Sequence, residues 1–330
     1  MQETQITHVN SCRSFIQEQE PLHTKNWFGT GGNACYYAQP TSTDEFKQAL
    51  CLAQTVQLPV FVLGEGANCL ISDTGFNGMI IRPQLCSIEA KELSKTTAHV
   101  TAGAGVSMAQ LIEYCLAHNY VGLEEFSGIP GTVGGSVYIN LHYFSFLIEQ
   151  FLVRATTIDA ITGEINIVTT DWFQFRYDYS KLHAKKQFLL DATFVLARAS
   201  DAETIYARGR AHEIVRHRSA RYPTKSTCGS FFRNFHEDEV TVISNGRKMI
   251  YAAYYLDKVN VKGTLQVGDA IVSYQHANMI VNMGCATSTD IISVARQMQE
   301  RVYQQFGVLL QPECQLIGFD EYPLHTHDTL

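Results

Sequence analysis

Helical and strand-like patterns of apolar residues follow one another in the first third of the chain. Ser42 and Glu45 stand three residues apart, as in a helix capping box, and apolar residues then recur at helical spacing. The apolar run at residues 59–63 predicts a buried strand, and a glycine-containing turn at residues 64–68 follows it at once. The predicted order is therefore helix, strand and tight glycine loop. The apolar positions of the helix are Phe46, Ala49, Leu50 and Ala53.

The remainder of the chain mixes short strand patterns with a few helices, which predicts an α+β fold. One long helix is predicted to begin near Thr289 and to end at Gly307. Its apolar face is Ile291, Val294, Ala295, Met298 and Val302. The other predicted elements are helices at about residues 107–117 and 202–218 and strands at residues 35–38, 79–81, 98–101, 240–243 and 279–281.

Length and composition indicate a globular protein of several subdomains and argue against nucleic-acid-binding and membrane-spanning proteins. A chain of 330 residues exceeds what one hydrophobic core usually serves, so two or three packed subdomains are expected. The net charge of −7 argues against broad nucleic-acid binding, and no eighteen apolar residues run together as in a membrane span. The first 20 residues are mostly polar and contain no positively flanked apolar segment such as an export signal has. The nine cysteines stand singly, without a CxxC pair or the spacing of a metal site. We therefore expect a cytoplasmic protein with reduced thiols and no metal ion.

Two glycine-rich segments are candidates for contact with a flat or phosphorylated ligand. Residues 64–68 place small residues directly after a strand, where backbone N–H groups can approach a pyrophosphate closely. Residues 128–136 hold four glycines and one proline without low complexity around them. Because a glycine weakens a regular element by roughly 0.5–1 kcal/mol, ligand contact is a natural reason for such a run. The alternative for both segments is a plain surface turn.

Three polar side chains could carry chemistry. Ser230 follows Gly229, but Phe232 stands where a GxSxG nucleophile elbow needs glycine, so hydrolase chemistry is not supported. Glu313 precedes a short apolar strand and, if buried, could act as an acid or an anionic stabiliser. His276 lies in a polar run before another strand. The alternatives are a structural serine, an exposed glutamate and a core histidine.

The order of these segments resembles the UDP-N-acetylenolpyruvoylglucosamine reductase (MurB) family over residues 26–319. The most specific match is GIPGTVGGS at residues 128–136, which is similar to the family's GIPGTVGGA. The other matches are residues 31–34 with GGxA, 64–70 with GxGSNxL, 229–234 with GSxFKN, 273–282 with SxxHAxxxxN and 312–313 with the terminal PE.

The resemblance implies a two-subdomain FAD-binding fold of the vanillyl-alcohol-oxidase/MurB type plus a C-terminal α+β substrate domain. In such enzymes NADPH reduces FAD, whose hydride then reduces UDP-N-acetylglucosamine enolpyruvate to UDP-N-acetylmuramate for peptidoglycan synthesis. We expect non-covalent FAD, a nucleotide-sugar substrate and a monomer. The implied divisions are FAD-binding subdomains at residues 1–85 and 86–201, a substrate-binding domain at residues 202–312, and a segment at residues 313–330 that returns to the FAD-binding region.

The resemblance also implies roles for individual residues. Ser230 is the expected proton donor to the substrate's α-carbon, and Glu313 is expected to help hold the enolate-like carboxylate. Substrate contacts are expected from Arg233, Asn234 and His276. The expected cofactor contacts are Gly64, Glu65, Gly66, Ala67, Asn68, Gly128, Ile129, Pro130, Gly131, Thr132, Gly134, Gly135 and Asn140.

The chain departs from the family pattern at two places. Asp178 stands where the family's FxYRxS motif carries its catalytic arginine, and residues 140–143 read NLHY instead of NAGA. The pattern of residues 173–179 predicts an extended segment, and residues two apart on a strand project from the same face. We therefore expect the side chain of Arg176 to supply the positive charge that the family's arginine provides at position 178. The alternative is that Arg176 is solvated and that Arg233 or another cation fills the role.

Two other functions stay open at this point. Another flavoprotein of the same fold could oxidise an alcohol or lactone, because flavin loops alone do not choose the substrate, although Ser230 and Glu313 argue against it. Asp178 favours a degenerate flavin- or nucleotide-sugar-binding module.

The span between residues 200 and 230 is too short for the tyrosine-bearing loop that one subtype of the family has. The chain therefore resembles the loop-lacking subtype, in a divergent form.

Overall fold

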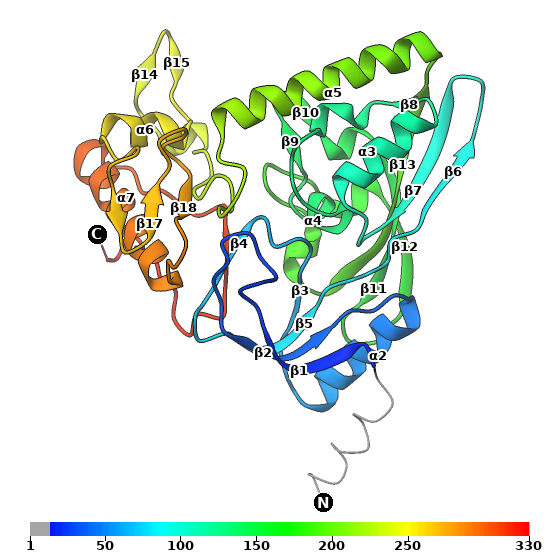
Figure 1. The fold of residues 1–330 in the computed structure, drawn as a ribbon, viewed down its shortest axis with the longest axis horizontal. Helices are drawn as coiled ribbons and strands as arrows, with labels where there is room; N and C mark the ends of the chain where they lie inside the picture. The colour runs from blue at the N-terminus through cyan, green and yellow to red at the C-terminus, as the bar shows by residue number, and fades with distance from the viewer. Residues whose placement is uncertain (1–13, 330) are drawn as a thin grey trace, which may run out of the picture. The chain divides into compact units, whose positions relative to one another are not determined.

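The computed structural model describes residues 14–329 as a mixed α and β chain in two compact units (Figure 1). Unit 1 comprises Met1–Glu20, Ala34–Glu65 and Asn77–Arg218, and unit 2 comprises Pro21–Asn33, Gly66–Phe76 and Ser219–Leu330. Cys12 and most of the polar leader lie outside the described residues. Among residues 14–329, no helix combines the length and the apolar character that a membrane span requires.

The first part of unit 1 is a four-stranded sheet in the order β1-β2-β5-β3. Helix α2 begins after Ser42, whose side chain accepts a hydrogen bond from the Glu45 N–H, so the predicted helix is confirmed. Its apolar residues share a core with Met79 and Ile81 of β5. The elements are β1 (Ile16–Pro21), β2 (Asn33–Ala38), α2 (Thr43–Thr55), β3 (Val60–Val62) and β5 (Phe76–Ile81).

The second part of unit 1 is a sheet in the order β12-β11-β13-β7-β6, with β8 also paired to β13. Helices α3 and α5 bury residues in its core, and the short helix α4 packs against β13 and β7. The strands are β6 (Ile88–Glu92), β7 (Thr97–Gly103), β8 (Tyr120–Val121), β9 (His142–Tyr143), β10 (Phe146–Leu147), β11 (Leu152–Asp159), β12 (Ile165–Thr169) and β13 (Gln187–Arg198). The helices are α3 (Met108–Ala117), α4 (Val133–Tyr138) and α5 (Asp201–Arg221), with 3-10 turns η1 (Leu123–Phe126), η2 (Ile148–Gln150), η3 (Thr170–Phe173) and η4 (Lys181–Ala184).

Unit 2 is organised around helix α7 (Ser288–Phe306), which packs on the sheet β16-β17-β18. The helix begins with a capping box between Thr287 and Asp290 and ends at Gly307, whose φ of 68° places it in the left-handed region. All five residues of the predicted apolar face are buried, which confirms that prediction. The other elements are β4 (Cys69–Ile71), η5 (Glu237–Glu239), β14 (Ile243–Ser244), β15 (Arg247–Lys248), α6 (Ala252–Lys258), β16 (Gln266–Val267), β17 (Ala270–Val272), β18 (Ile280–Asn282) and β19 (Gln315–Ile317).

The strand predicted at residues 240–243 is wrong for most of its length. Only Ile243 and Ser244 pair with a neighbouring strand, which is β15 of the same hairpin (Figure 1). Asn245 and Gly246 at the turn have φ values of 50° and 73°, which suits a tight two-residue hairpin. Apolar spacing alone therefore overstated the strand.

Burial separates the cysteines into protected and accessible thiols. Every cysteine among residues 14–329 is a free thiol. Burial raises the pKa of Cys69 in unit 2 and of Cys115 in unit 1 to about 12, and it raises the pKa of Cys314 beside Cys228. Cys51, Cys86 and Cys285 are exposed.

We expect iodoacetamide at pH 8 to alkylate the exposed thiols and to spare Cys69, Cys115 and Cys314 in the folded protein. A thiol with a pKa of about 12 is ionised in roughly one molecule in ten thousand at this pH, and only the thiolate reacts. Peptide mass spectrometry before and after denaturation measures the difference. Labelling of Cys314 at the rate of Cys285 in the folded protein would contradict its burial.

Candidate functional site

The two glycine-rich segments meet within unit 1. The Gly131 N–H donates to the Glu65 carboxylate at 3.0 Å, and a Cβ added at Gly64 would lie 2.7 Å from Thr132 Oγ1. Gly131 has φ near +136°, a conformation that favours glycine, and a Cβ there would meet nothing within 4 Å. Gly64 is therefore required by close packing, whereas Gly131 faces open space.

Residues 133–138 form a helix that the glycine run concealed. Thr132 is its N-cap, and Thr132 Oγ1 accepts from the Gly135 N–H at 3.2 Å. The Gly134 N–H donates to the Ala104 carbonyl at 3.0 Å, and a Cβ at Gly134 would lie 3.1 Å from that oxygen. Gly134 is thus explained by packing of α4, and the N–H groups of Gly134 and Gly135 are already used within the protein.

The start of the second segment is fixed by neighbouring elements of unit 1. The Gly128 carbonyl accepts from Arg218 Nε at 3.1 Å, and the Ile129 N–H donates to Phe126 at 3.2 Å. Pro130 follows directly. Ser127, just before this segment, is buried, and its Oγ has no hydrogen-bond partner among the described residues.

In unit 2 the residues Gly66, Ala67 and Asn68 form the loop that leads into β4. The Gly66 carbonyl accepts from the Trp27 N–H at 3.0 Å, while Asn68 Oδ1 is buried without a partner among the described residues. A buried polar atom left unpaired costs about 1–3 kcal/mol. Asn68 in unit 2 and Ser127 in unit 1 each therefore carry a polar atom that a hydrogen-bonding ligand could satisfy.

Backbone pairing in unit 2 brings together three segments that were singled out from the sequence. Phe232 and Pro312 form an antiparallel bridge, and the Glu313 N–H donates to the Phe231 carbonyl at 2.9 Å. Ser230 and Glu313, far apart in sequence, therefore flank one bridge. On the other side, Asn278 Nδ2 donates to the Phe232 carbonyl at 2.7 Å, and Asn278 Oδ1 accepts from the Phe232 N–H at 3.1 Å.

His276 is held in a neutral form beside this bridge. Burial lowers the pKa of His276, and Tyr222 packs edge-on against its ring at 5.3 Å between centroids. The Asn278 N–H lies 3.3 Å from Nδ1, so Nδ1 accepts and Nε2 carries the proton. In this tautomer Nε2 is the hydrogen-bond donor of the ring.

Arg233 and Asn234 have partners within unit 2. The guanidinium of Arg233 makes a two-pronged ion pair with Glu239 at 2.6 and 2.8 Å, and these hydrogen bonds lower the pKa of Glu239 to about 2. Asn234 Oδ1 accepts from the Ala252 N–H at the start of α6 at 3.1 Å. Glu239 was not found from the sequence, because nothing in the charged run at residues 236–239 distinguishes it from a solvated carboxylate.

The segment at residues 173–179 is not extended, and that expectation was wrong. The 3-10 turn η3 ends at Phe173, and Gln174 has φ 49°. Arg176 and Tyr179 then exchange backbone hydrogen bonds of 3.1 and 3.2 Å around a tight turn in which Asp178 has φ 52°. Two residues in the left-handed region reverse the chain, so Arg176 and Asp178 do not share a strand face.

The two departures from the family pattern lie against each other in unit 1. His142 Nδ1 is 3.4 Å from the Asp178 carboxylate, and the His142 ring packs on Tyr177 at 4.9 Å between centroids. Asn140 Nδ2 donates to the Arg176 carbonyl at 3.2 Å and so ties the turn to the segment of His142. His142 is a site candidate that no sequence motif indicated.

No three His, Cys, Asp or Glu residues among those described are placed to hold a metal ion.

Comparison with known proteins identifies the chain. Residues 34–168 match the FAD binding domain model, and residues 222–317 match the UDP-N-acetylenolpyruvoylglucosamine reductase C-terminal domain model.

Two named relatives and one solved structure extend this match to nearly the whole chain. UDP-N-acetylenolpyruvoylglucosamine reductase of Latilactobacillus sakei is 33% identical over 304 residues, covering 92% of this chain and 93% of the relative. The enzyme of the same name from Trichormus variabilis is 31% identical, covering 96% and 90%. The reductase (MurB) structure from Thermus caldophilus aligns with a TM-score of 0.71 at 24% identity, covering 92% and 98%, and confirms the expected fold class. The chain belongs to the UDP-N-acetylenolpyruvoylglucosamine reductase family.

Proposed function

We propose that the chain catalyses the NADPH-dependent, FAD-mediated reduction of UDP-N-acetylenolpyruvoylglucosamine to UDP-N-acetylmuramate in peptidoglycan precursor synthesis. Family membership over more than nine-tenths of the chain supports the reaction. The observation that supports the assignment of residues is the Phe232–Pro312 bridge, in which the Glu313 N–H donates to the carbonyl of Phe231, the residue after Ser230.

The chemistry needs a hydride and a proton on neighbouring carbons of the enolpyruvyl group. When bound, FAD supplies the hydride after its reduction by NADPH. Ser230 donates the proton to the α-carbon, and Glu313 assists in stabilising the enolate-like carboxylate. A serine is a poor acid in water. Ser230 is half-buried and its sequence neighbours Cys228, Phe231 and Phe232 are buried, which supports the dry surroundings that this role needs.

The proposed cofactor-binding residues are those that the family resemblance implies. Glu65, Asn68, Gly131 and Asn140, with the neighbours of the first three in the glycine segments, contact the cofactor. Arg233, Asn234 and His276 contact the nucleotide sugar. A first FAD-binding subdomain that ends near residue 85 remains part of the proposal, although the hydrophobic core around α2 and β5 also takes in Ile158, Phe188 and Leu190 of the later sheet. The proposal includes a cytoplasmic, monomeric protein.

Two half-reactions test the proposed function. We expect the purified protein to be yellow, to release its flavin on acid precipitation, and to be bleached by NADPH without oxygen. Addition of the enolpyruvyl sugar should then restore the oxidised flavin spectrum. Bleaching without reoxidation would indicate another flavin oxidoreductase. A colourless protein, or a yellow one that NADPH does not bleach, would indicate a degenerate module.

Ser230→Ala is expected to leave flavin reduction by NADPH nearly unchanged and to slow reoxidation by substrate at least about a hundredfold. The reason is that general acid catalysis typically contributes 10²–10⁴-fold and that the serine acts only on the substrate. Stopped-flow absorbance separates the two steps, and Ser244→Ala on the β14–β15 hairpin is the matched control. Equal slowing of both steps would argue against the role.

We also propose Arg176 as the cation of the site, with His142 as its rival beside Asp178. The guanidinium of Arg176 lies over the Tyr179 ring, 5.7 Å from its centroid. Arg176 is exposed, so the proposal requires bound substrate to exclude water from its guanidinium. Loss of a contact to a developing anion that is desolvated in this way costs about 3 kcal/mol, or roughly a hundredfold in rate. We therefore expect Arg176→Ala to slow flavin reoxidation by that factor and His142→Gln to slow it less. A rate of Arg176→Ala within about threefold of wild type would remove Arg176 from the site.

A further inference from the structure

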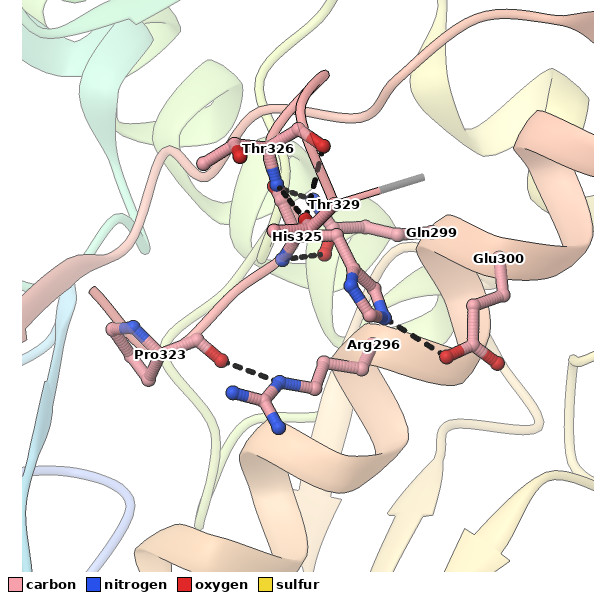
Figure 2. Close-up of polar contacts among 7 residues, drawn as sticks. All are labelled: Arg296, Gln299, Glu300, Pro323, His325, Thr326 and Thr329. Atoms are coloured by element: carbon pink, nitrogen blue, oxygen red, sulfur yellow. Dashed lines mark hydrogen bonds and ion pairs between the residues drawn. The ribbon is translucent and has the colours of Figure 1, made fainter. Parts of the chain in front are cut away.

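Gln299 is a fully buried polar residue on the apolar face of α7. Its Nε2 donates to the Leu310 carbonyl at 2.8 Å and lies 3.3 Å from the His325 carbonyl, and its Oε1 accepts from the His325 N–H at 3.0 Å. Figure 2 shows the Gln299 and His325 part of this arrangement. One amide therefore joins the helix to two separate segments of the chain.

The first of these segments is the C-terminal tail, residues 323–329. Arg296 Nε donates to the Pro323 carbonyl at 2.6 Å, and His325 Nε2 lies 2.8 Å from the Glu300 carboxylate (Figure 2). Leu324 is buried in the core of unit 2, and a turn between Thr326 and Thr329 closes the tail. The tail is thus docked along α7 by side-chain and backbone contacts on both sides of Gln299.

The second segment carries Glu313. Leu310 is fully buried, and the next residue, Gln311, accepts from the Arg233 N–H at 2.9 Å. Pro312 then bridges to Phe232, and the Glu313 N–H donates to Phe231. Beyond Glu313, the Gln315 N–H donates to the Asn68 carbonyl at 3.1 Å. The hydrogen bond from Gln299 Nε2 to the Leu310 carbonyl therefore holds the backbone directly before the paired residues 311–315.

We propose that Gln299 is a positioning residue that couples the docked C-terminal tail to the segment of Glu313. Loss of the amide would leave the Leu310 carbonyl and the His325 N–H buried and unpaired, and the chain would have to shift to find partners for them. A displacement of about 1 Å at a reacting group can reduce a rate on the order of a hundredfold. The catalytic part of this inference rests on the proposed function, whereas the structural coupling does not.

Gln299→Met tests the catalytic part, because methionine has similar volume and no amide. Flavin reoxidation by the enolpyruvyl sugar should slow by at least about tenfold, while flavin reduction by NADPH stays within about twofold. Arg296→Met is the matched control, since it removes one contact to the tail and none to Leu310. Reoxidation within twofold of wild type in a folded Gln299→Met holoenzyme would overturn the positioning role.

Hydrogen exchange of the holoenzyme without substrate tests the coupling independently of the reaction. In Gln299→Met, and in a chain that ends at Tyr322, the amides of Arg233 and Glu313 should exchange at least about tenfold faster than in wild type. The Val272 amide, which donates to Leu265 within unit 2, is the internal reference and should change by less than twofold. Equal acceleration of all three amides would mean that Gln299 only stabilises unit 2, and no acceleration in the shortened chain would overturn the coupling. If Gln299→Met does not fold, the shortened chain decides the question by the same measurement.

Discussion

The site depends on a short piece of backbone pairing between residues 231–233 and residues 311–313. Pro312 has no N–H group, so the bridge is made by the N–H groups on either side of the pair, from Arg233 and from Glu313. Backbone hydrogen bonds fix the Cα positions from which side chains project, whatever rotamers the side chains adopt. The pairing therefore brings the backbone of Glu313 next to Phe231, the residue that follows Ser230.

The parts of the structure that depend on local sequence could be predicted. Helix α2 has its N-cap at Ser42, and helix α7 has its capping box and its terminal glycine where the pattern placed them. Capping and apolar spacing act over one or two turns, so they are readable from the sequence alone. The two glycine segments and the Ser230 and Glu313 motifs were also recognised, because the family pattern preserves their spacing.

Some features that could not be predicted are set by contacts distant in sequence. Gln299 reads as an ordinary surface residue of an amphipathic helix, and only the fold brings Leu310 and His325 to its amide. The turn around Asp178 depends on Asn140, which holds the Arg176 carbonyl. Strand-like composition at residues 173–179 gave no indication that two residues there would take positive φ values.

The interleaving of the two units along the chain has a consequence for synthesis on the ribosome. Unit 2 includes residues 21–33 and 66–76, but most of its residues come after residue 218. Strand β4 pairs in parallel with β19, so this early strand cannot form that pairing until residues 315–317 have been made. The nascent chain must keep Leu70 and Ile71, which are fully buried in the finished fold, from associating elsewhere during that interval. Neither unit can be excised as one continuous fragment, and unit 2 cannot complete its β4–β19 pairing before residues 315–317 have been made.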